Sequence, residues 1–155
     1  MAAFAKSVPG TDIVACNQDF GGCFTVKGRE FIDAGLISSQ IKKVLKEHGI
    51  PEEAVRKAAV VTFEAEVNII SYADTGIISF KVENGTIIIE AIDKGAGIPD
   101  IESALIEGFS TADDQVREMG FGAGMGLPNI KKFSDVFEIH SETGQGTVVR
   151  SIIKI

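Results

Sequence analysis

Cysteine is scarce in this chain of 155 residues, and long apolar runs and an excess of positive charge are missing. Cys16 and Cys23 have no nearby cysteine or histidine to complete a zinc site, so we expect ordinary thiols rather than a metal or redox centre. The longest apolar runs, such as residues 87–89, are far too short to cross a membrane, and the N-terminus shows no signal peptide. We therefore expect a cytoplasmic protein without membrane contact.

The net charge is −7, from 15 basic and 22 acidic side chains. Nucleic acid is usually bound by clustered lysine and arginine, and the few lysine clusters here fit the solvated faces of helices. Direct binding to nucleic acid is therefore not expected. The 45% of hydrophobic residues and the chain length indicate a single folded domain.

Hydrophobic periodicity and turn residues predict an α+β order of elements. Asn84-Gly85 favours a β-hairpin, and Pro51 followed by two glutamates favours a helix start. The stretch 108–124 is polar and has little periodicity. The expected elements are strands at 23–27, 77–82, 86–92, 136–141 and 148–153, and helices at 29–47, 51 to about 73, 100–106 and 127–134. Antiparallel strands with helices on one face are the expected arrangement.

Glu64 and Asn68 stand four residues apart on the second long helix, and therefore on one face of it. An exposed polar stripe is one interpretation. In the other, the Asn68 amide oxygen binds a hard cation and the Glu64 carboxylate accepts a proton from an attacking hydroxyl.

The segment 93–98 follows a hydrophobic strand and contains two glycines. It is either an ordinary turn at the end of a strand or one wall of a ligand site. In the second case, the Asp93 carboxylate accepts a hydrogen bond from an exocyclic amine, while Gly95 and Gly97 allow close backbone approach.

Glycine occupies every second position from 120 to 126, which is either a flexible surface loop or a place where a ligand meets bare backbone. A dinucleotide fingerprint is excluded because Leu127 stands where its last glycine belongs, and a Walker loop is excluded because no Lys-Ser or Lys-Thr follows. The segment precedes a predicted helix. Free N–H groups at such a position suit a phosphate.

In this order, the three clusters resemble the ATP-binding domain shared by gyrase, Hsp90, histidine kinases and MutL, the GHKL family. Residues 64–68 resemble its N box, 93–97 and 122–127 its two glycine boxes, and Gly146-Thr147 its final box. The resemblance covers residues 22–155 and leaves 1–21 as an N-terminal extension. It implies the Bergerat-type fold, a two-layer sandwich in which helices cover one face of a mixed, mainly antiparallel sheet.

The resemblance also implies a role for each matching residue. Asn68 would coordinate Mg²⁺, Glu64 would be the general base, and Asp93, supported by Thr147, would bind the adenine amino group of ATP. Residues 108–124 would form the ATP lid, with Arg117 as a phosphate contact. The base pocket would include Gly95, Gly97 and Ile98, and the phosphates would be covered by Gly122, Gly124, Met125, Gly126 and Leu127.

Within this superfamily the stretches DKGAGIPDIESALIEGFST and GMGLPNIKKFSDVFEIHSETGQGT are most similar to bacterial anti-sigma-factor serine/threonine kinases. That similarity implies transfer of the ATP γ-phosphate to a small antagonist protein, with a sigma factor or antagonist as partner and a homodimer as assembly. A histidine kinase is not expected, because His48 ends a predicted helix, His140 lies in a strand, and no room remains for a phospho-accepting domain. A non-catalytic nucleotide-dependent binding module and a slow ATPase stay open as alternatives.

Overall fold

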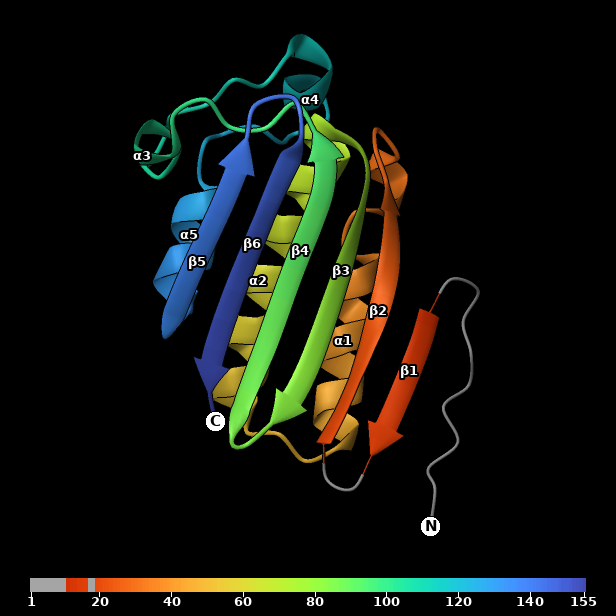
Figure 1. The fold of residues 1–155 in the computed structure, drawn as a ribbon. Coiled ribbons are helices and arrows are strands. Elements are labelled where there is room, and N and C mark those ends of the chain that lie inside the picture. Colours follow the sequence, from red (N-terminus) through yellow and green to blue (C-terminus); the bar gives the residue numbers. More distant parts are fainter. Residues whose placement is uncertain (1–10, 17–18) are drawn as a thin grey trace.

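One antiparallel sheet and the helices packed on one of its faces make up the molecule in the computed structural model, which describes residues 11–16 and 19–155 (Figure 1). Within these residues the sheet has six strands in the order β1-β2-β3-β4-β6-β5. The strands are β1 (Thr11–Cys16), β2 (Asp19–Lys27), β3 (Ala73–Glu83), β4 (Thr86–Gly95), β5 (Val136–Glu142) and β6 (Gly146–Lys154). The helices are η1 (Phe31–Asp33), α1 (Leu36–Glu47), α2 (Glu52–Tyr72), α3 (Ile101–Ala104), α4 (Asp114–Glu118) and α5 (Gly126–Phe133).

The order of the strands brings the end of β4 next to the start of β6. β3 and β4 form the expected hairpin, with Asn84 and Gly85 both at positive φ in its turn. β6 then inserts between β4 and β5, and its register places Thr147 opposite Asp93. Two predicted site residues that are far apart in the sequence thus become cross-strand neighbours.

Helix α2 is the centre of the helical layer and crosses behind β3, β4 and β6 in Figure 1. Its inner face buries an apolar row that includes Val61, Ala65 and Ile69, and it packs against Ile41 and Leu45 of α1 and against isoleucines of the sheet. Burial of each valine, leucine or isoleucine side chain in this layer contributes about 1.5–3 kcal/mol. The long rigid helix is therefore a firm support for the polar residues on its other faces.

The α+β fold with helices on one face is confirmed, and two details of the sheet differ from the expectation. Every strand pair among the described residues is antiparallel, so the sheet is not mixed. In addition, β1 pairs with β2 along residues 11–16, within the stretch predicted to be an extension. Residues 19–21 of that stretch begin β2, and residues 1–10 and 17–18 lie outside the described residues.

Several helix and strand boundaries in the structure differ from the predicted ones. The first long helix starts at Leu36 rather than 29, because Gly35 adopts a left-handed backbone (φ 95°) that separates it from η1. β3 begins directly after α2, at Ala73 rather than 77, and β4 continues to Gly95. The stretch 108–124 contains α4, which the weak periodicity did not predict.

Of the helices that the structure describes, none is both long enough and apolar enough to span a membrane.

Candidate functional site

A cavity of about 560 Å³ lies between α2, the adjoining ends of β4 and β6, and the segment 108–126. This volume is typical of sites that bind small molecules. All three sequence clusters contribute to its wall. The predicted site residues that line it are Glu64, Asn68, Asp93, Gly95, Gly97, Ile98, Gly122, Gly124, Met125, Gly126, Leu127 and Thr147.

Asp93 lies at the floor of the cavity, at the end of β4. Its Oδ1 accepts a hydrogen bond from the Gly95 N–H at 2.8 Å, which fixes the carboxylate orientation. Burial raises the pKa of the Asp93 carboxyl, while the backbone N–H groups of Gly95 and Thr147 act in the opposite direction. A partly buried and oriented acceptor of this kind can discriminate an exocyclic amine from other groups.

Ser141 of β5 joins the walls around Asp93, and no local pattern predicted this role. Its hydroxyl accepts a hydrogen bond from the Ile98 N–H at 2.7 Å and lies 2.8 Å from Oγ1 of Thr147. The loop after β4 is therefore held against β6 through one side chain of β5. A serine in a strand with alternating polar and apolar residues does not indicate a binding site unless the order of the strands is known.

A polar stripe on α2 forms the second part of the floor, beside the ends of β4 and β6. Glu64 and Asn68 both line the cavity, and Ser71 continues the stripe at the next helical turn. The Ser71 residue is 1% exposed, and its hydroxyl has no hydrogen-bond partner among the described residues. Ser71 was not predicted, although the spacing 64–68–71 would have placed it on the same face.

The first turn of α5 packs directly on this stripe. A Cβ at Gly126 would lie 2.8 Å from Asn68 Oδ1, so a larger residue here would require the Asn68 side chain to move. One turn later, Asn129 Nδ2 donates a hydrogen bond to Glu64 Oε1 at 2.9 Å. Asn129 was also missed, because only the packing of α5 against α2 makes it a neighbour of Glu64.

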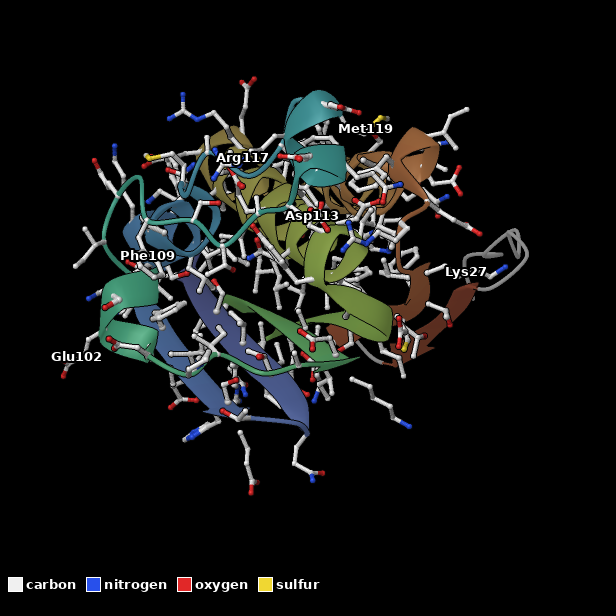
Figure 2. All side chains as sticks on the ribbon, turned by 90° about the horizontal axis from the view of Figure 1, so that it is seen from above. Lys27, Glu102, Phe109, Asp113, Arg117 and Met119 are labelled. Atoms are coloured by element: carbon white, nitrogen blue, oxygen red, sulfur yellow. The ribbon has the colours of Figure 1, made fainter. Side chains whose placement is uncertain are left out.

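The segment 108–124, called the lid below, has its two ends joined. The Gly108 N–H donates to the Gly124 carbonyl oxygen at 3.0 Å, close to the boundaries expected from the sequence. Gly124 has φ 74°, and a Cβ there would lie 2.4 Å from the Phe109 oxygen, so this end of the lid requires glycine. Figure 2 looks down on this end of the molecule, with Phe109, Asp113 and Arg117 labelled on the lid.

Among the described residues, the side chains of Val116, Phe121 and Asp113 attach the lid to the rest of the molecule. Val116 of α4 is fully buried, and Phe121 stacks on Phe31 with ring centroids 5.9 Å apart. An ion pair joins Arg29 to Asp113, with 2.9 Å between Nη2 and Oδ2. The Arg29 guanidinium lowers the pKa of the Asp113 carboxyl, which also caps α4 by accepting from the Val116 N–H at 3.0 Å.

Arg117 is the one predicted site residue that the structure does not bring to the cavity wall. The cause is α4, whose last turn carries Arg117 and whose geometry turns the guanidinium back, so that Nε donates to the Ala112 carbonyl oxygen at 3.2 Å. The sequence did carry a signal for this helix, since Asp113 is a favoured N-cap and Gly120 follows its end.

Hard oxygen donors in the cavity fit Mg²⁺ held largely by a ligand. The described residues contain no cluster of three or more histidine, cysteine, aspartate or glutamate side chains that could hold a metal alone. Mg²⁺ commonly takes only one or two protein oxygens and completes its shell with phosphates and water. Asn68 Oδ1, beside Gly126 and in the cavity wall, is such a donor.

Comparison with known proteins agrees with this geometry. The family described as histidine kinase-, DNA gyrase B-, and HSP90-like ATPase matches residues 53–155. Serine/threonine-protein kinase RsbT of Bacillus subtilis is 36% identical over 118 residues, which span 72% of this chain and 80% of that protein. The anti-sigma F factor of Caldanaerobacter subterraneus is 37% identical over 98 residues, 63% of this chain and 61% of that protein.

Among solved structures, the histidine kinase domain of the blue-light activated histidine kinase from Erythrobacter litoralis EL346 is similar, with a TM-score of 0.46 and 15% identity. The matched region covers 78% of this chain and 60% of the histidine kinase chain. The match of the family to two thirds of the chain, together with the identity to RsbT, leads to one conclusion. The chain belongs to the histidine kinase-, DNA gyrase B- and HSP90-like ATPases and is related within them to serine/threonine kinases and anti-sigma factors.

Proposed function

We propose that this protein is an ATP-dependent serine/threonine protein kinase that transfers the γ-phosphate of ATP to a small antagonist protein. One observation supports this most: Glu64 lines the same cavity as Asn68, Asp93 and the glycines of 122–126. A carboxylate able to take a proton is thus placed together with candidate groups for the base, the metal and the phosphates. The name of the relative RsbT, a serine/threonine-protein kinase, supports the same activity.

In the proposed reaction, a serine or threonine hydroxyl of the antagonist attacks the γ-phosphorus. The new oxygen–phosphorus bond forms as the bond to the β-phosphate oxygen breaks, ADP leaves, and the hydroxyl proton passes to the Glu64 carboxylate. Asp93, with Thr147 beside it, binds the adenine amino group. The backbone of 122–126 and the start of α5 contact the phosphates, where free N–H groups favour negative charge.

Mg²⁺ bound through Asn68 would neutralise phosphate charge during transfer. Met125 and Leu127 lie in the wall on either side of Gly126, while Gly95, Gly97 and Ile98 line the base end. These residues exclude water and orient ATP. No phosphate contact is assigned to Arg117 in the arrangement described.

The proposed partners are a sigma factor or its antagonist, bound by a cytoplasmic homodimer of this chain. Relatives named anti-sigma F factor support this choice of partner. In this proposal, phosphorylation of the antagonist changes which partner the protein holds.

The test is a transfer assay with γ-labelled ATP, Mg²⁺ and the protein products of the neighbouring genes as candidate acceptors. The native protein should yield phosphoserine or phosphothreonine on one of them. Glu64→Gln should bind ATP as tightly as the native protein. It should transfer phosphate at least about 100-fold more slowly, since a general base contributes about 10²–10⁴ in rate.

Glu90 provides a matched control for Glu64. Glu90 lies on β4, opposite Arg150 in the strand register and on the other face of the sheet, so Glu90→Gln should transfer phosphate at the native rate. Phosphate release without any acceptor would indicate a slow ATPase, and binding of nucleotide and partner without phosphoprotein would indicate a nucleotide-dependent binding module. Full transfer by Glu64→Gln would contradict the role of Glu64.

A further inference from the structure

Asn129 donates the one side-chain hydrogen bond to Glu64 among the described residues. Its amide nitrogen Nδ2 lies 2.9 Å from Glu64 Oε1, across the contact between α5 and α2. Both side chains are partly buried. A hydrogen bond to a carboxylate in such a place is stronger than one between neutral groups on the surface.

We propose that Asn129 is a positioning residue for the catalytic carboxylate, an inference that rests on the proposed function. With Oε1 engaged by Asn129, rotation about the last bond of the Glu64 side chain is restricted. Oε2 is then the oxygen that receives the proton of the attacking hydroxyl. A base held in one orientation transfers a proton more often than one that samples several rotamers.

The position of Asn129 also links the base to the glycine segment. The Asn129 backbone N–H donates to the Met125 carbonyl oxygen at 2.9 Å, within the first turn of α5. Gly126 of the same turn lies against Asn68. One turn of helix therefore touches the proposed metal ligand, the proposed base and the proposed phosphate-binding backbone, so ordering this turn around a nucleotide also sets the orientation of Glu64.

The chemistry of asparagine suits this function. The amide donates a hydrogen bond without carrying a charge, so it holds the carboxylate without forming an ion pair that would compete for the incoming proton. Aspartate has nearly the same shape but only acceptor oxygens when ionised, and it would face Glu64 with a like charge. The substitution Asn129→Asp consequently separates the hydrogen bond from the packing.

The experiment compares Asn129→Ala, Asn129→Asp and a control, Lys131→Ala, which changes an exposed residue of the same helix. Transfer from labelled ATP and nucleotide affinity are measured for each. Both Asn129 variants should lower the transfer rate constant about 10- to 100-fold with nucleotide affinity changed less than about threefold, because positioning acts on the chemical step. Lys131→Ala should behave as the native protein.

A double substitution adds a readout that a merely structural role would not change. In the Glu64→Gln background, Asn129→Ala should lower the transfer rate little further, since residues that act as a unit are not additive. If Asn129 only supports the fold, its loss should lower the urea midpoint and nucleotide affinity together and add fully to Glu64→Gln.

The outcomes are distinguishable from those of the proposed function. If the native protein transfers phosphate and both Asn129 variants transfer it at the native rate, this inference alone is overturned. Absence of transfer by the native protein, with every acceptor tried, would contradict the proposed function and this inference together.

Discussion

The two sides of the cavity are built in different ways. The floor, formed by α2 with the adjoining ends of β4 and β6, presents Asp93 and Thr147 from paired strands and Glu64 from a buried helix. The lid (residues 108–124) is mostly exposed, has glycines with positive φ at 108, 120, 122 and 124, and is attached through a few side chains. In the proposed function, groups in fixed positions would recognise the ligand, and the exposed segment would close over it.

This difference explains where a substitution should matter. In the proposed function, the floor residues would contact the ligand directly, so their loss should weaken binding most. Each lid contact would contribute a small part of the free energy of loop closure, so its loss should weaken binding less.

Loss of the floor carboxylate should have the largest effect. Asp93→Ala removes the proposed acceptor for the adenine amine, and a hydrogen bond to a charged group contributes about 1.5–3 kcal/mol, so ATP affinity should fall about 10- to 150-fold. Isothermal titration calorimetry measures the change. Glu90→Ala, on the same strand but the other face, is the matched control. Affinity within twofold of the native value for Asp93→Ala would show that the base is bound elsewhere.

In the lid, the larger effect should come from the aromatic contact. Phe121→Ala removes the stack on Phe31, and because aromatic pairs contribute about 0.5–1.5 kcal/mol, ATP affinity should fall about two- to tenfold. Trypsin should also cut faster after Arg117 in α4. Met119→Ala, which changes an exposed lid residue, should leave both properties unchanged. Unchanged proteolysis in Phe121→Ala would mean that the stack does not restrain the lid.

The floor helix also carries a buried acid, Glu66, that should make stability depend on pH. Its carboxylate accepts from the N–H groups of Ile37 and Ser38, at 3.5 and 3.4 Å, and so caps α1, where Gly35 has no side chain to do so. Burial raises the pKa of Glu66 despite these hydrogen bonds. The folded state therefore holds the proton more tightly than the unfolded state.

The direction in which the free energy of unfolding changes with pH follows from this difference in proton binding. The contribution of Glu66 to the free energy of unfolding is fully present below its ordinary pKa and is lost as pH rises through the higher folded-state pKa. Glu66→Gln should flatten this part of the profile of urea midpoint against pH. The Asp93 carboxyl titrates in both proteins, so the difference between the two profiles reports Glu66. Identical profiles would contradict the assignment.

The smallest effect should come from the lid ion pair. The side chains of Arg29 and Asp113 are 42% and 53% exposed, and exposed pairs contribute little. Arg29→Ala should change ATP affinity by less than about twofold, with a difference that shrinks further as salt increases. Lys27→Ala, which breaks the exposed pair with Glu30, is the control. A tenfold loss in Arg29→Ala would show that the lid is held mainly by charge.

The floor was predictable from sequence to a greater extent than the lid. The spacing of Glu64 and Asn68 depends only on helix geometry, and Asp93 follows a strand whose hydrophobic pattern is clear. Their meeting with Thr147 depends on β6 inserting beside β4, which local pattern does not determine. Ser141 and Asn129 were not predicted for the same reason, because each forms a hydrogen bond with a residue distant in sequence, Ile98 and Glu64 respectively.

In the lid, the missed elements had weak local signals. α4 is only one turn long, so its apolar periodicity reduces to the buried Val116, and the prediction for Arg117 assumed an irregular loop.

Around residues 29–36, outside the lid, the periodicity was strong but continued through Gly35, where the backbone φ of 95° ends any helix. β1 was missed because its sequence is short and lies among polar and glycine residues.

Amide hydrogen exchange, followed by mass spectrometry with and without Mg²⁺ and a non-hydrolysable ATP analogue, tests the contrast between floor and lid most directly. With nucleotide bound, exchange should slow in peptides spanning 108–126 and change little in those of α2, whose amides are already protected by its helical hydrogen bonds and burial. Exchange in 108–126 that the nucleotide leaves unchanged, or protection that appears only in other segments, would contradict this contrast.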